Sequence, residues 1–263
     1  MTSPAPTGGS LGRAWRYLYR VPLLLVHIFL LLPLVLLSMV PLWSGLQLGG
    51  ERLEHRAIRA WSGGLMRIFG FRLRRVGTPL PGAVLFVANH VSWVDIEMLH
   101  SQRMMGFVAK QEIRGWPVVG WLTARGETIF HQRGSTASLD GVMQAMIARL
   151  REGRAVGVFP EGGTRDGREL GPFHARILLP AVEAAVPVQP VALRYGPRGD
   201  AQPVVAFAPG ESFFANFVRL LGEPARETTV CFLEPIRPGE IEGRRHIAEL
   251  ARDRIVQAMQ GND

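Results

Sequence analysis

Cysteine is almost absent from the sequence, since Cys231 is the only one among 263 residues. A single thiol forms neither an internal disulfide nor a cysteine-cluster metal site, which argues against a disulfide scaffold, a zinc finger and an iron–sulfur protein. Charged residues are also few, at 20%, whereas 47% of the residues are apolar. Apolar residues in this proportion can bury a sizeable core, so we expect one compact domain with an appendage rather than a disordered or fibrous chain.

Acidic residues are scarce in the first 80 positions, which contain ten arginines and only Glu51 and Glu54, a balance of +8. The remaining positions contain twenty lysines or arginines and twenty acids, so the rest of the chain is balanced in charge. A nucleic-acid enzyme is expected to carry basic surface on its folded body. The charge distribution therefore argues against a nucleic-acid partner and places all the excess positive charge in the N-terminal part.

Charge is absent altogether from residues 21–43, an apolar run of 23 residues that follows three arginines. Such a run is long enough to enter a bilayer. A cleaved signal peptide is the alternative, but the run exceeds the usual apolar region and no small-x-small cleavage site follows it cleanly. Pro33 and Pro41 interrupt the run, so both a spanning helix and a re-entrant pair stay open. We interpret His27, which has no acidic partner nearby, as a histidine packed against neighbouring helices or near an interface.

Residues 51–70 follow with apolar side chains at helical spacing and four arginines between them. This pattern predicts a basic amphipathic helix lying in a membrane surface. The alternative is an ordinary surface helix packed on the soluble domain, with solvated arginines. We therefore expect residues 1–70 to form a flexible tail, a membrane helix and this amphipathic helix, and residues 71–263 to form the main domain.

Beyond residue 70, short apolar runs alternate with helical patterns, which predicts an α/β domain whose mixed, largely parallel sheet is flanked by helices. The sequence has no repeat with a period of 20 to 50 residues, which argues against a solenoid. The predicted strands are 71–76, 83–88, 105–109, 127–131, 154–159, 186–193 and 227–234, and the predicted helices are 93–101, 117–125, 136–152, 174–185, 211–221 and 243–260.

The chemistry-bearing segment follows the second of these strands, where residues 89–95 read NHVSWVD. Ligands meet side chains at the carboxyl ends of strands in α/β domains, and His90 lies at such an end. Asp95, in the first turn of the next helix, can fold back onto one imidazole nitrogen and leave the other free to accept a proton. The alternative is structural, because Ser92 and Asp95 also fit a helix capping box.

Four ordered blocks give the sequence a resemblance to the glycerolipid acyltransferases, the family that includes the lysophosphatidic acid acyltransferases. NHVSWVD resembles the family's N-H-x-S-x-x-D block, and the later blocks resemble its F-P-E-G-T-R and V-P-x-x-P-V patterns and the basic block between them. The four lie at residues 89–95, 110–120 with 129–133, 159–165, and 186–191.

This resemblance implies transfer of an acyl group from a thioester to a lipid hydroxyl. His90 would be the general base and Asp95 would hold it, while Asn89 and Ser92 would lie in the substrate site. We interpret Ser92 as a helix cap rather than a nucleophile, and Cys231 as a core residue.

An anionic substrate would need positive charge, and the resemblance offers Lys110, Arg133 and Arg165 for a phosphate of the acceptor or of coenzyme A. Each of the three could instead be a solvated cation at a strand end. Glu161 forms a flexible strand-exit loop with Gly162 and Gly163, and its backbone could approach a substrate closely. Thr164 would belong to the same substrate-binding loop, and the alternative is a simple turn.

That loop departs from the family pattern, because Glu161 is followed by Gly162, Gly163 and Thr164 before Arg165. Without a gap, Gly163 replaces the family's threonine and Thr164 its arginine, so Arg165 would act only after a shift of one residue. The segments that follow look closer to the lyso-ornithine lipid acyltransferase branch, whose acceptor bears an aminoacyl headgroup.

The sequence thus predicts a membrane-bound O-acyltransferase that uses acyl-CoA or acyl carrier protein, acylates a lysophospholipid at the cytoplasmic leaflet of the inner membrane, and needs no metal or redox cofactor. We expect 1-acylglycerol-3-phosphate as the acceptor, with lyso-ornithine lipid as the alternative. A lipid hydrolase and a non-catalytic lipid binder remain from other classes. Residues 8–12 match G-x-S-x-G, but they lie in the N-terminal tail rather than between a strand and a helix, which argues against a serine hydrolase.

Overall fold

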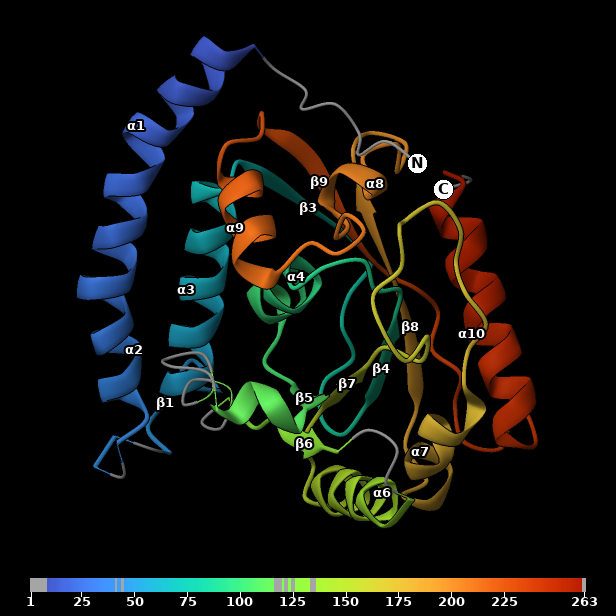
Figure 1. Ribbon diagram of the computed structural model, residues 1–263. Coiled ribbons are helices and arrows are strands. Elements are labelled where there is room, and N and C mark those ends of the chain that lie inside the picture. Colours follow the sequence, from blue (N-terminus) through green and yellow to red (C-terminus); the bar gives the residue numbers. More distant parts are fainter. Residues whose placement is uncertain are drawn as a thin grey trace.

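A seven-stranded mixed sheet forms the centre of the computed structural model, with strand order β3-β9-β8-β4-β7-β5-β6 (Figure 1). The structure describes residues 9–261 except 41, 44, 116–119, 121–122, 124–125 and 133–135. Neighbouring strands are parallel apart from β8 and β9, which pair antiparallel. The strands are β3 (Phe71–Val76), β4 (Leu85–Ala88), β5 (Gly106–Lys110), β6 (Ile129–His131), β7 (Val156–Val158), β8 (Val188–Tyr195) and β9 (Arg226–Phe232).

Helices cover both faces of this sheet. The longer ones are α1 (Ser10–Val26), α3 (Leu53–Ile68), α4 (Val94–Gln102), α6 (Thr136–Arg151), α9 (Phe213–Leu221) and α10 (Arg244–Met259). Shorter elements are α2 (Leu32–Ser38), α7 (Leu179–Glu183), α8 (Gln202–Val205), 3-10 turns at Gln111–Gly115 and Ala175–Leu178, and the hairpin of β1 (Gln47–Leu48) with β2 (Glu51–Arg52). All seven strands of the sheet and the predicted α/β class are therefore confirmed. The predicted helix at 117–125 falls mostly outside the described residues.

Strand β4 shows how the sheet separates two apolar cores. Leu85 and Val87 point into a core completed by α6, α7 and α10. Phe86 and Ala88 point into the other, completed by α3, α4 and α9. This alternation follows from the period of two along a strand, and all four side chains are buried. The segment that follows β4 thus leaves the sheet from a strand that is buried along its whole length.

The N-terminal apolar run is one continuous helical stretch from Ser10 to Ser38, in which a π-helical turn at His27–Leu31 joins α1 to α2. Pro33 lies in the first turn of α2, directly after the π turn. A proline ring cannot donate to the helical ladder, and a π turn is one way to absorb that defect without ending the helix. Residues 10–38 therefore form one helical stretch that does not break at Pro33, while Pro41 lies outside the described residues. By length and composition the stretch could cross a membrane.

Helix α3 packs between this N-terminal helix and α4 (Figure 1). Its buried residues include Ile58, Leu65 and Met66, with Leu65 and Met66 belonging to the core beside α4. Amphipathic patterning was thus correctly predicted. The packing is that of the alternative interpretation, in which the apolar face of the helix is covered by protein.

The three arginines before the apolar run contact protein rather than extending into solvent. Arg20 is buried and donates to the carbonyl oxygens of Leu221 and Glu223, at 2.9 and 2.7 Å. Arg16 donates to the Gly222 carbonyl at 2.6 Å, and Arg13 lies 3.4 Å from the Glu223 carboxylate. These carbonyls belong to the end of α9, where a helix leaves acceptors unsatisfied and favours cations. Part of the N-terminal charge therefore fastens α1 to α9.

Candidate active site

The segment after β4 is anchored to β8 by Asn89. Its side-chain amide nitrogen donates to the carbonyl of Leu193 at 3.0 Å, and its amide oxygen accepts from the Leu193 backbone N–H at 2.8 Å. Asn89 is almost fully buried. The amide thereby fixes where the chain leaves the sheet, so the structure shows a scaffolding contact for a residue predicted to lie in the substrate site.

Asp95 is completely buried and gathers four donors on its carboxylate. One oxygen, Oδ2, accepts from the His90 ring Nδ1 at 2.8 Å and from the backbone N–H groups of Val91 and Ser92 at 2.7 and 2.9 Å. The other, Oδ1, accepts from the Tyr195 hydroxyl at 2.5 Å. The predicted His90–Asp95 contact is thus present, together with the backbone contact that the capping alternative required.

Ser92 does not cap α4, contrary to the sequence interpretation. The residue before the helix is Trp93, and no side chain caps its first turn. The Ser92 hydroxyl instead donates to Asn216 Oδ1 at 3.4 Å. Asp95 accepts from the Ser92 backbone N–H, and the fully buried Ser92 hydroxyl has its hydrogen-bond partner on α9.

The His90 ring is held on its face as well as on its edge. It stacks on Phe159 with ring centroids 3.9 Å apart and planes inclined by 13°, and Phe159 stacks in turn on Phe107. With Nδ1 turned to Asp95, Nε2 is the atom left for a substrate, and among the described residues none hydrogen-bonds to it. The ring is 15% exposed. This geometry suits a general base, in which a carboxylate fixes the tautomer and one nitrogen stays open.

Tyr195 keeps the Asp95 carboxylate in place. Burial raises the pKa of the Tyr195 hydroxyl well above its ordinary value, and the neighbouring Asp95 charge raises it further. The hydroxyl therefore stays protonated and donates to Asp95 throughout the physiological range. Tyr195 ends β8, directly after the last of the four sequence blocks, but no local pattern showed that its hydroxyl would meet Asp95 100 positions away.

Glu161 ties the next loop to His90. Its Oε1 accepts from the His90 backbone N–H and its Oε2 from the Gly171 backbone N–H, both at 2.9 Å. The Arg165 backbone N–H donates to the His90 carbonyl at 2.9 Å, so the two loops are joined on both sides of His90. Burial raises the pKa of Glu161, partly offset by those two backbone hydrogen bonds and by Arg165.

The remaining loop residues take different positions. Gly162 has φ +74°, a conformation that favours glycine, and a Cβ there would lie 3.2 Å from the His174 ring, which would have to shift slightly. Gly163 is half-buried and Thr164 is exposed. The side chain of Arg165 is 44% exposed and its Nε lies 3.7 Å from Glu161.

The predicted cations are not all gathered beside His90. Lys110 ends β5 with an exposed side chain, in register with His131 of β6, and β7 separates β5 from β4 in the sheet. Arg133 lies outside the described residues. Of the two predicted cations that the structure describes, Arg165 is the one whose backbone hydrogen-bonds to His90. Among the described residues, no group of three or more His, Cys, Asp or Glu side chains lies close enough to hold a metal ion.

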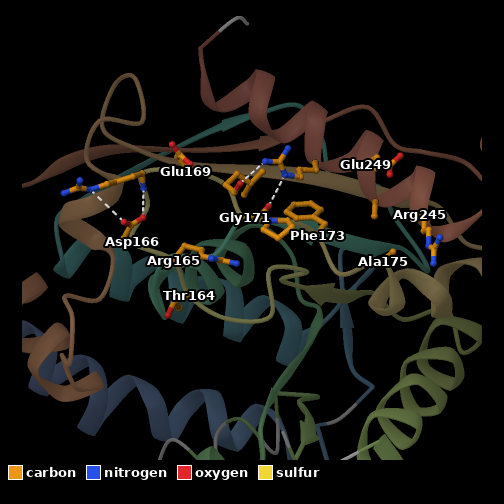
Figure 2. Close-up of a pocket in the computed structure, with 14 residues that line it drawn as sticks. Thr164, Arg165, Asp166, Glu169, Gly171, Phe173, Ala175, Arg245 and Glu249 are labelled. Atoms are coloured by element: carbon orange, nitrogen blue, oxygen red, sulfur yellow. Dashed lines mark hydrogen bonds and ion pairs between the residues drawn. The ribbon is translucent and has the colours of Figure 1, made fainter. Parts of the chain in front are cut away.

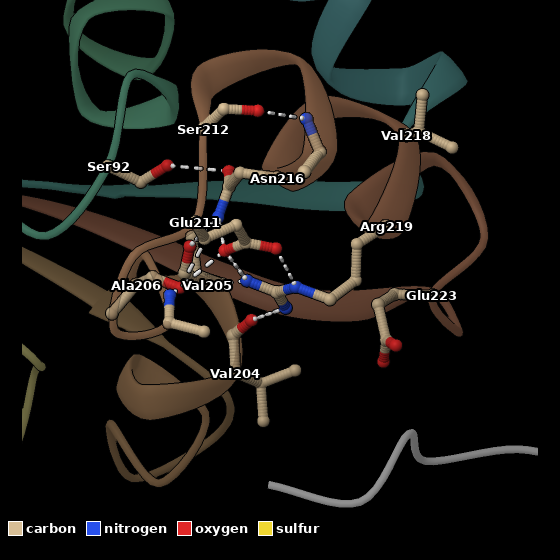
Figure 3. Close-up of polar contacts among 12 residues, drawn as sticks. Ser92, Val204, Val205, Ala206, Glu211, Ser212, Asn216, Val218, Arg219 and Glu223 are labelled. Carbon is tan, nitrogen blue, oxygen red and sulfur yellow. Dashed lines mark hydrogen bonds and ion pairs between the residues drawn. The ribbon is translucent and has the colours of Figure 1, made fainter. Parts of the chain in front are cut away.

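A polar network on α9 supports the segment that contains His90 from the other side and was not predicted from the sequence (Figure 3). Asn216 Oδ1 accepts from Trp93 Nε1 at 3.0 Å as well as from Ser92. Its amide nitrogen donates to the Glu211 carboxylate at 2.9 Å, and Arg219 donates to both oxygens of the same carboxylate at 2.7 and 2.9 Å. The loop before α9 and the turn after His90 are therefore parts of one hydrogen-bonded unit.

The Glu211 carboxylate makes the stability of this hydrogen-bonded unit depend on pH. Burial by itself would raise the pKa of Glu211, but hydrogen bonds from Arg219, the Ala208 amide and Asn216 outweigh it and lower the pKa to about 2. A carboxyl with a depressed folded-state pKa stabilises the fold above its unfolded pKa of about 4.5, and loses that contribution as pH falls through the folded value.

We therefore expect Glu211→Gln to flatten the pH dependence of the unfolding free energy between about pH 4.5 and pH 2, since it removes a contribution on the order of 1 to 3 kcal/mol. Urea unfolding at a series of pH values in that window measures the slope. Exposed Glu240, which pairs with Arg237 at 3.9 Å, provides the control variant Glu240→Gln. Equal slopes for wild type and Glu211→Gln would contradict the assignment.

Comparison with known proteins shows which family the chain resembles. The acyltransferase family model matches residues 74–194, which contain His90, Asp95 and the Glu161 loop. A lyso-ornithine lipid O-acyltransferase from Pseudomonas aeruginosa is 35% identical over 209 residues, which are 80% of each chain. A 1-acyl-sn-glycerol-3-phosphate acyltransferase from Neisseria gonorrhoeae is 36% identical over 154 residues, 57% of this chain and 60% of its own.

The fold is also similar to a solved structure. The crystal structure of the 1-acyl-sn-glycerophosphate (LPA) acyltransferase PlsC from Thermotoga maritima superposes with a TM-score of 0.74 over 95% of each chain, at 19% sequence identity. Identity this low bears on the fold alone. The family match, the relatives and the fold together show that the chain belongs to the acyltransferase family of the lyso-ornithine lipid and 1-acyl-sn-glycerol-3-phosphate enzymes, and that it is an acyltransferase of lipid biosynthesis.

Proposed function

We propose that the protein moves a fatty acyl group from a thioester, acyl-CoA or acyl carrier protein, to the free hydroxyl of lyso-ornithine lipid, with His90 as the general base. The observation that carries this proposal is the His90 ring itself. Its Nδ1 lies 2.8 Å from the buried Asp95 carboxylate and its face rests on Phe159, while Nε2 remains open to a substrate hydroxyl.

In the proposed reaction one acyl group is transferred, and His90 takes up one proton and releases it again. Nε2 takes the proton of the lipid hydroxyl as the hydroxyl oxygen bonds to the thioester carbonyl carbon. The carbon–sulfur bond then breaks, and the imidazolium returns the proton to the departing sulfur. Asp95 stabilises the imidazolium without becoming protonated. The acyl group passes directly from the thioester to the lipid hydroxyl and only the proton passes through His90, so the proposed chemistry requires neither a metal nor a redox cofactor.

The choice of acceptor is supported by the extent of the similarity. Resemblance to the lyso-ornithine lipid O-acyltransferases extends over 80% of the chain for the Pseudomonas relative and 74% for one from Brucella abortus. For the Neisseria 1-acyl-sn-glycerol-3-phosphate acyltransferase it covers 57%.

The second candidate acceptor is 1-acylglycerol-3-phosphate, which the partly exposed Arg165 guanidinium favours. If that lipid is the acceptor, Arg165→Ala raises its KM by roughly 10- to 100-fold, the equivalent of one charge-assisted hydrogen bond worth about 1.5–3 kcal/mol. If lyso-ornithine lipid is the acceptor, the same variant leaves the preference between the two lipids as it is in the wild type.

The test is a matrix of two donors against acceptors, with the purified full-length protein. Labelled acyl-CoA and acyl carrier protein are each offered lyso-ornithine lipid, 1-acylglycerol-3-phosphate or no lipid, and the products are separated. We expect diacyl ornithine lipid as the main product and little free fatty acid. Preferential acylation of 1-acylglycerol-3-phosphate would overturn the proposed acceptor, and release of free acid in every reaction would identify a hydrolase.

The proposed reaction takes place at the cytoplasmic face of the inner membrane. Support comes from the N-terminal helical stretch Ser10–Ser38, in which an 18-residue segment has a mean hydropathy of 2.6 and is only 22% buried. Large apolar side chains such as Phe29, Leu34 and Leu37 are more than half exposed there. An apolar surface of this kind is expected to be covered by lipid.

Salt washing checks the membrane proposal. Because apolar burial rather than charge is expected to hold the chain, high salt should leave the full-length protein in the membrane pellet, and detergent should release it. Immunodetection in pellet and supernatant measures the distribution, with a peripheral protein of the same cells as control. Recovery of the intact chain in the high-salt supernatant would refute membrane anchoring by this helix.

A further inference from the structure

A polar groove lies beside the His90 site, between the loop after Glu161 and helix α10 (Figure 2). Its volume is about 1090 Å³, which is enough for a polar headgroup with ordered water. The near end begins at Thr164 and Arg165, and the far end reaches Arg245 at the start of α10. Nothing in the mechanism proposed above uses this groove.

Hydrogen bonds connect the wall of the groove to the backbone of His90. Gly171 lines its wall, and the same Glu161 carboxylate that accepts from the Gly171 N–H accepts from the His90 N–H. Arg165, at its near end, donates its own backbone N–H to the His90 carbonyl. The loop at the near end of the groove is therefore held by the same hydrogen bonds that hold the backbone of His90.

Both charge signs line the groove in nearly equal number. Four arginines face three carboxylates, which leaves an excess of one positive charge; the set is Arg165, Arg168, Arg245, Arg252, Asp166, Glu169 and Glu249. The phosphates of coenzyme A would require a clear excess of cations, which the groove lacks. A ligand with one positive and one negative group matches this lining better than a polyanion does.

Several of these charges are already engaged. Arg252 donates to the carbonyls of Leu170 and Gly171 at 2.9 and 3.0 Å, and so holds the loop against α10. Arg165 lies beside Glu161 and Arg168 beside Asp166. Among the described residues, Arg245 and Glu249 have no hydrogen bond or ion pair with one another or with a third group, although they are one helical turn apart on α10.

We infer that this groove binds the zwitterionic aminoacyl headgroup of the acceptor, with Arg245 on its carboxylate and Glu249 on its ammonium group. The inference rests on the proposed function and names the part of the substrate that lies away from the reacting hydroxyl. An ornithine acylated on its α-amino group keeps one carboxylate and one δ-ammonium group. Side chains four residues apart on a helix are about 5–6 Å apart at Cβ, a spacing that suits the two ends of this headgroup.

The experiment measures steady-state kinetics for Arg245→Gln and Glu249→Gln with lyso-ornithine lipid. Each variant removes one charge but keeps hydrogen-bonding capacity at an exposed position. We expect the KM for this acceptor to rise about tenfold in each, with kcat within twofold of wild type, because neither side chain touches the reacting atoms. Nα-acetylornithine should inhibit the wild type competitively and inhibit both variants much less.

Matched controls come from the same helix start. Arg244→Gln and Glu242→Gln remove the same charges at exposed neighbours that do not line the groove. KM changes in Arg245→Gln and Glu249→Gln no larger than in these controls, with a wild type that does acylate lyso-ornithine lipid, would overturn the groove assignment and leave the proposed function standing. A wild type that does not acylate lyso-ornithine lipid would overturn the proposed acceptor, and the groove assignment with it.

Discussion

Replacing His90 by alanine is expected to lower kcat/KM for acyl transfer by about 10²–10⁴-fold while the protein stays folded. The reason is that His90 Nε2 is the atom proposed to take the hydroxyl proton, and the ring is already oriented by Asp95 at 2.8 Å and by Phe159 at 3.9 Å between centroids. Removal of the ring leaves any contribution from substrate positioning but no base. Acyl transfer from labelled acyl-CoA to lyso-ornithine lipid measures the loss.

Asp95→Asn and Tyr195→Phe extend this test to the groups behind the imidazole. Asparagine turns an amide donor or a weaker acceptor toward the N–H groups that Asp95 now accepts, so we expect loss of activity, smaller than for His90→Ala, together with lower stability. Tyr195→Phe removes one donor from the far carboxylate oxygen and leaves the His90 contact in place. Its effect on kcat should be the smallest of the three.

The control for the dyad is His246→Ala, since His246 is an exposed histidine on α10 whose ring contacts only its own helix start. Circular dichroism and the unfolding midpoint in detergent show whether each variant is folded. A folded His90→Ala protein with near-normal turnover would exclude His90 as the base. It would favour the alternative interpretation, in which this histidine has only a structural role.

The strands were predictable because each is short, apolar and bounded by turn or helix signals. β4 and β8 are buried along their whole length, so their sequences read as continuous apolar runs. Edge strand β3 was equally clear from its alternation, although three of its six residues are exposed arginines. Local pattern and burial agree in all these segments, which is the condition under which sequence alone suffices.

The His90–Asp95 contact was predictable for the same reason, since five positions separate the two residues and a single turn joins them. The partners of Asp95 and Ser92 on other elements were not. Tyr195 and Asn216 lie 100 and 124 positions away, and only the assembled sheet and α9 bring them close. Ser92 was misassigned as a cap because the capping pattern is local, whereas its actual hydrogen bond is not.

The contacts of the N-terminal arginines could not be predicted for a similar reason. Their position before an apolar run is typical of a membrane-flanking segment, and that pattern says nothing of the end of α9. The structure places their guanidinium groups on carbonyls and on Glu223 more than 200 positions along the chain. The exposed positive charge of this region therefore comes mainly from its other arginines, such as Arg56, Arg67 and Arg72.

Arg20 gives the second large expected effect, because Arg20→Ala should lower the unfolding free energy by about 2–4 kcal/mol. The guanidinium is 2% exposed and donates from Nη1 to the carbonyls of Leu221 and Glu223. Hydrogen bonds to a charged group are worth about 1.5–3 kcal/mol each, and their loss also leaves two carbonyls at the α9 end without this partner. The midpoint of urea unfolding in detergent, with the slope checked for constancy, measures the change.

Arg72→Ala is the matched control, since it removes the same charge from an exposed position on β3 and should change the unfolding free energy by less than about 0.5 kcal/mol. The Arg20 variant should also lose acyl transfer, because α9 carries Asn216, whose amide oxygen holds Trp93 and Ser92 beside His90. Loosening α1 from α9 therefore reaches the catalytic turn through two hydrogen-bonded steps. An Arg20→Ala protein as stable as Arg72→Ala would show that apolar packing alone holds the N-terminal helix. The Leu221 and Glu223 carbonyls would then be hydrogen-bonded to water in the variant.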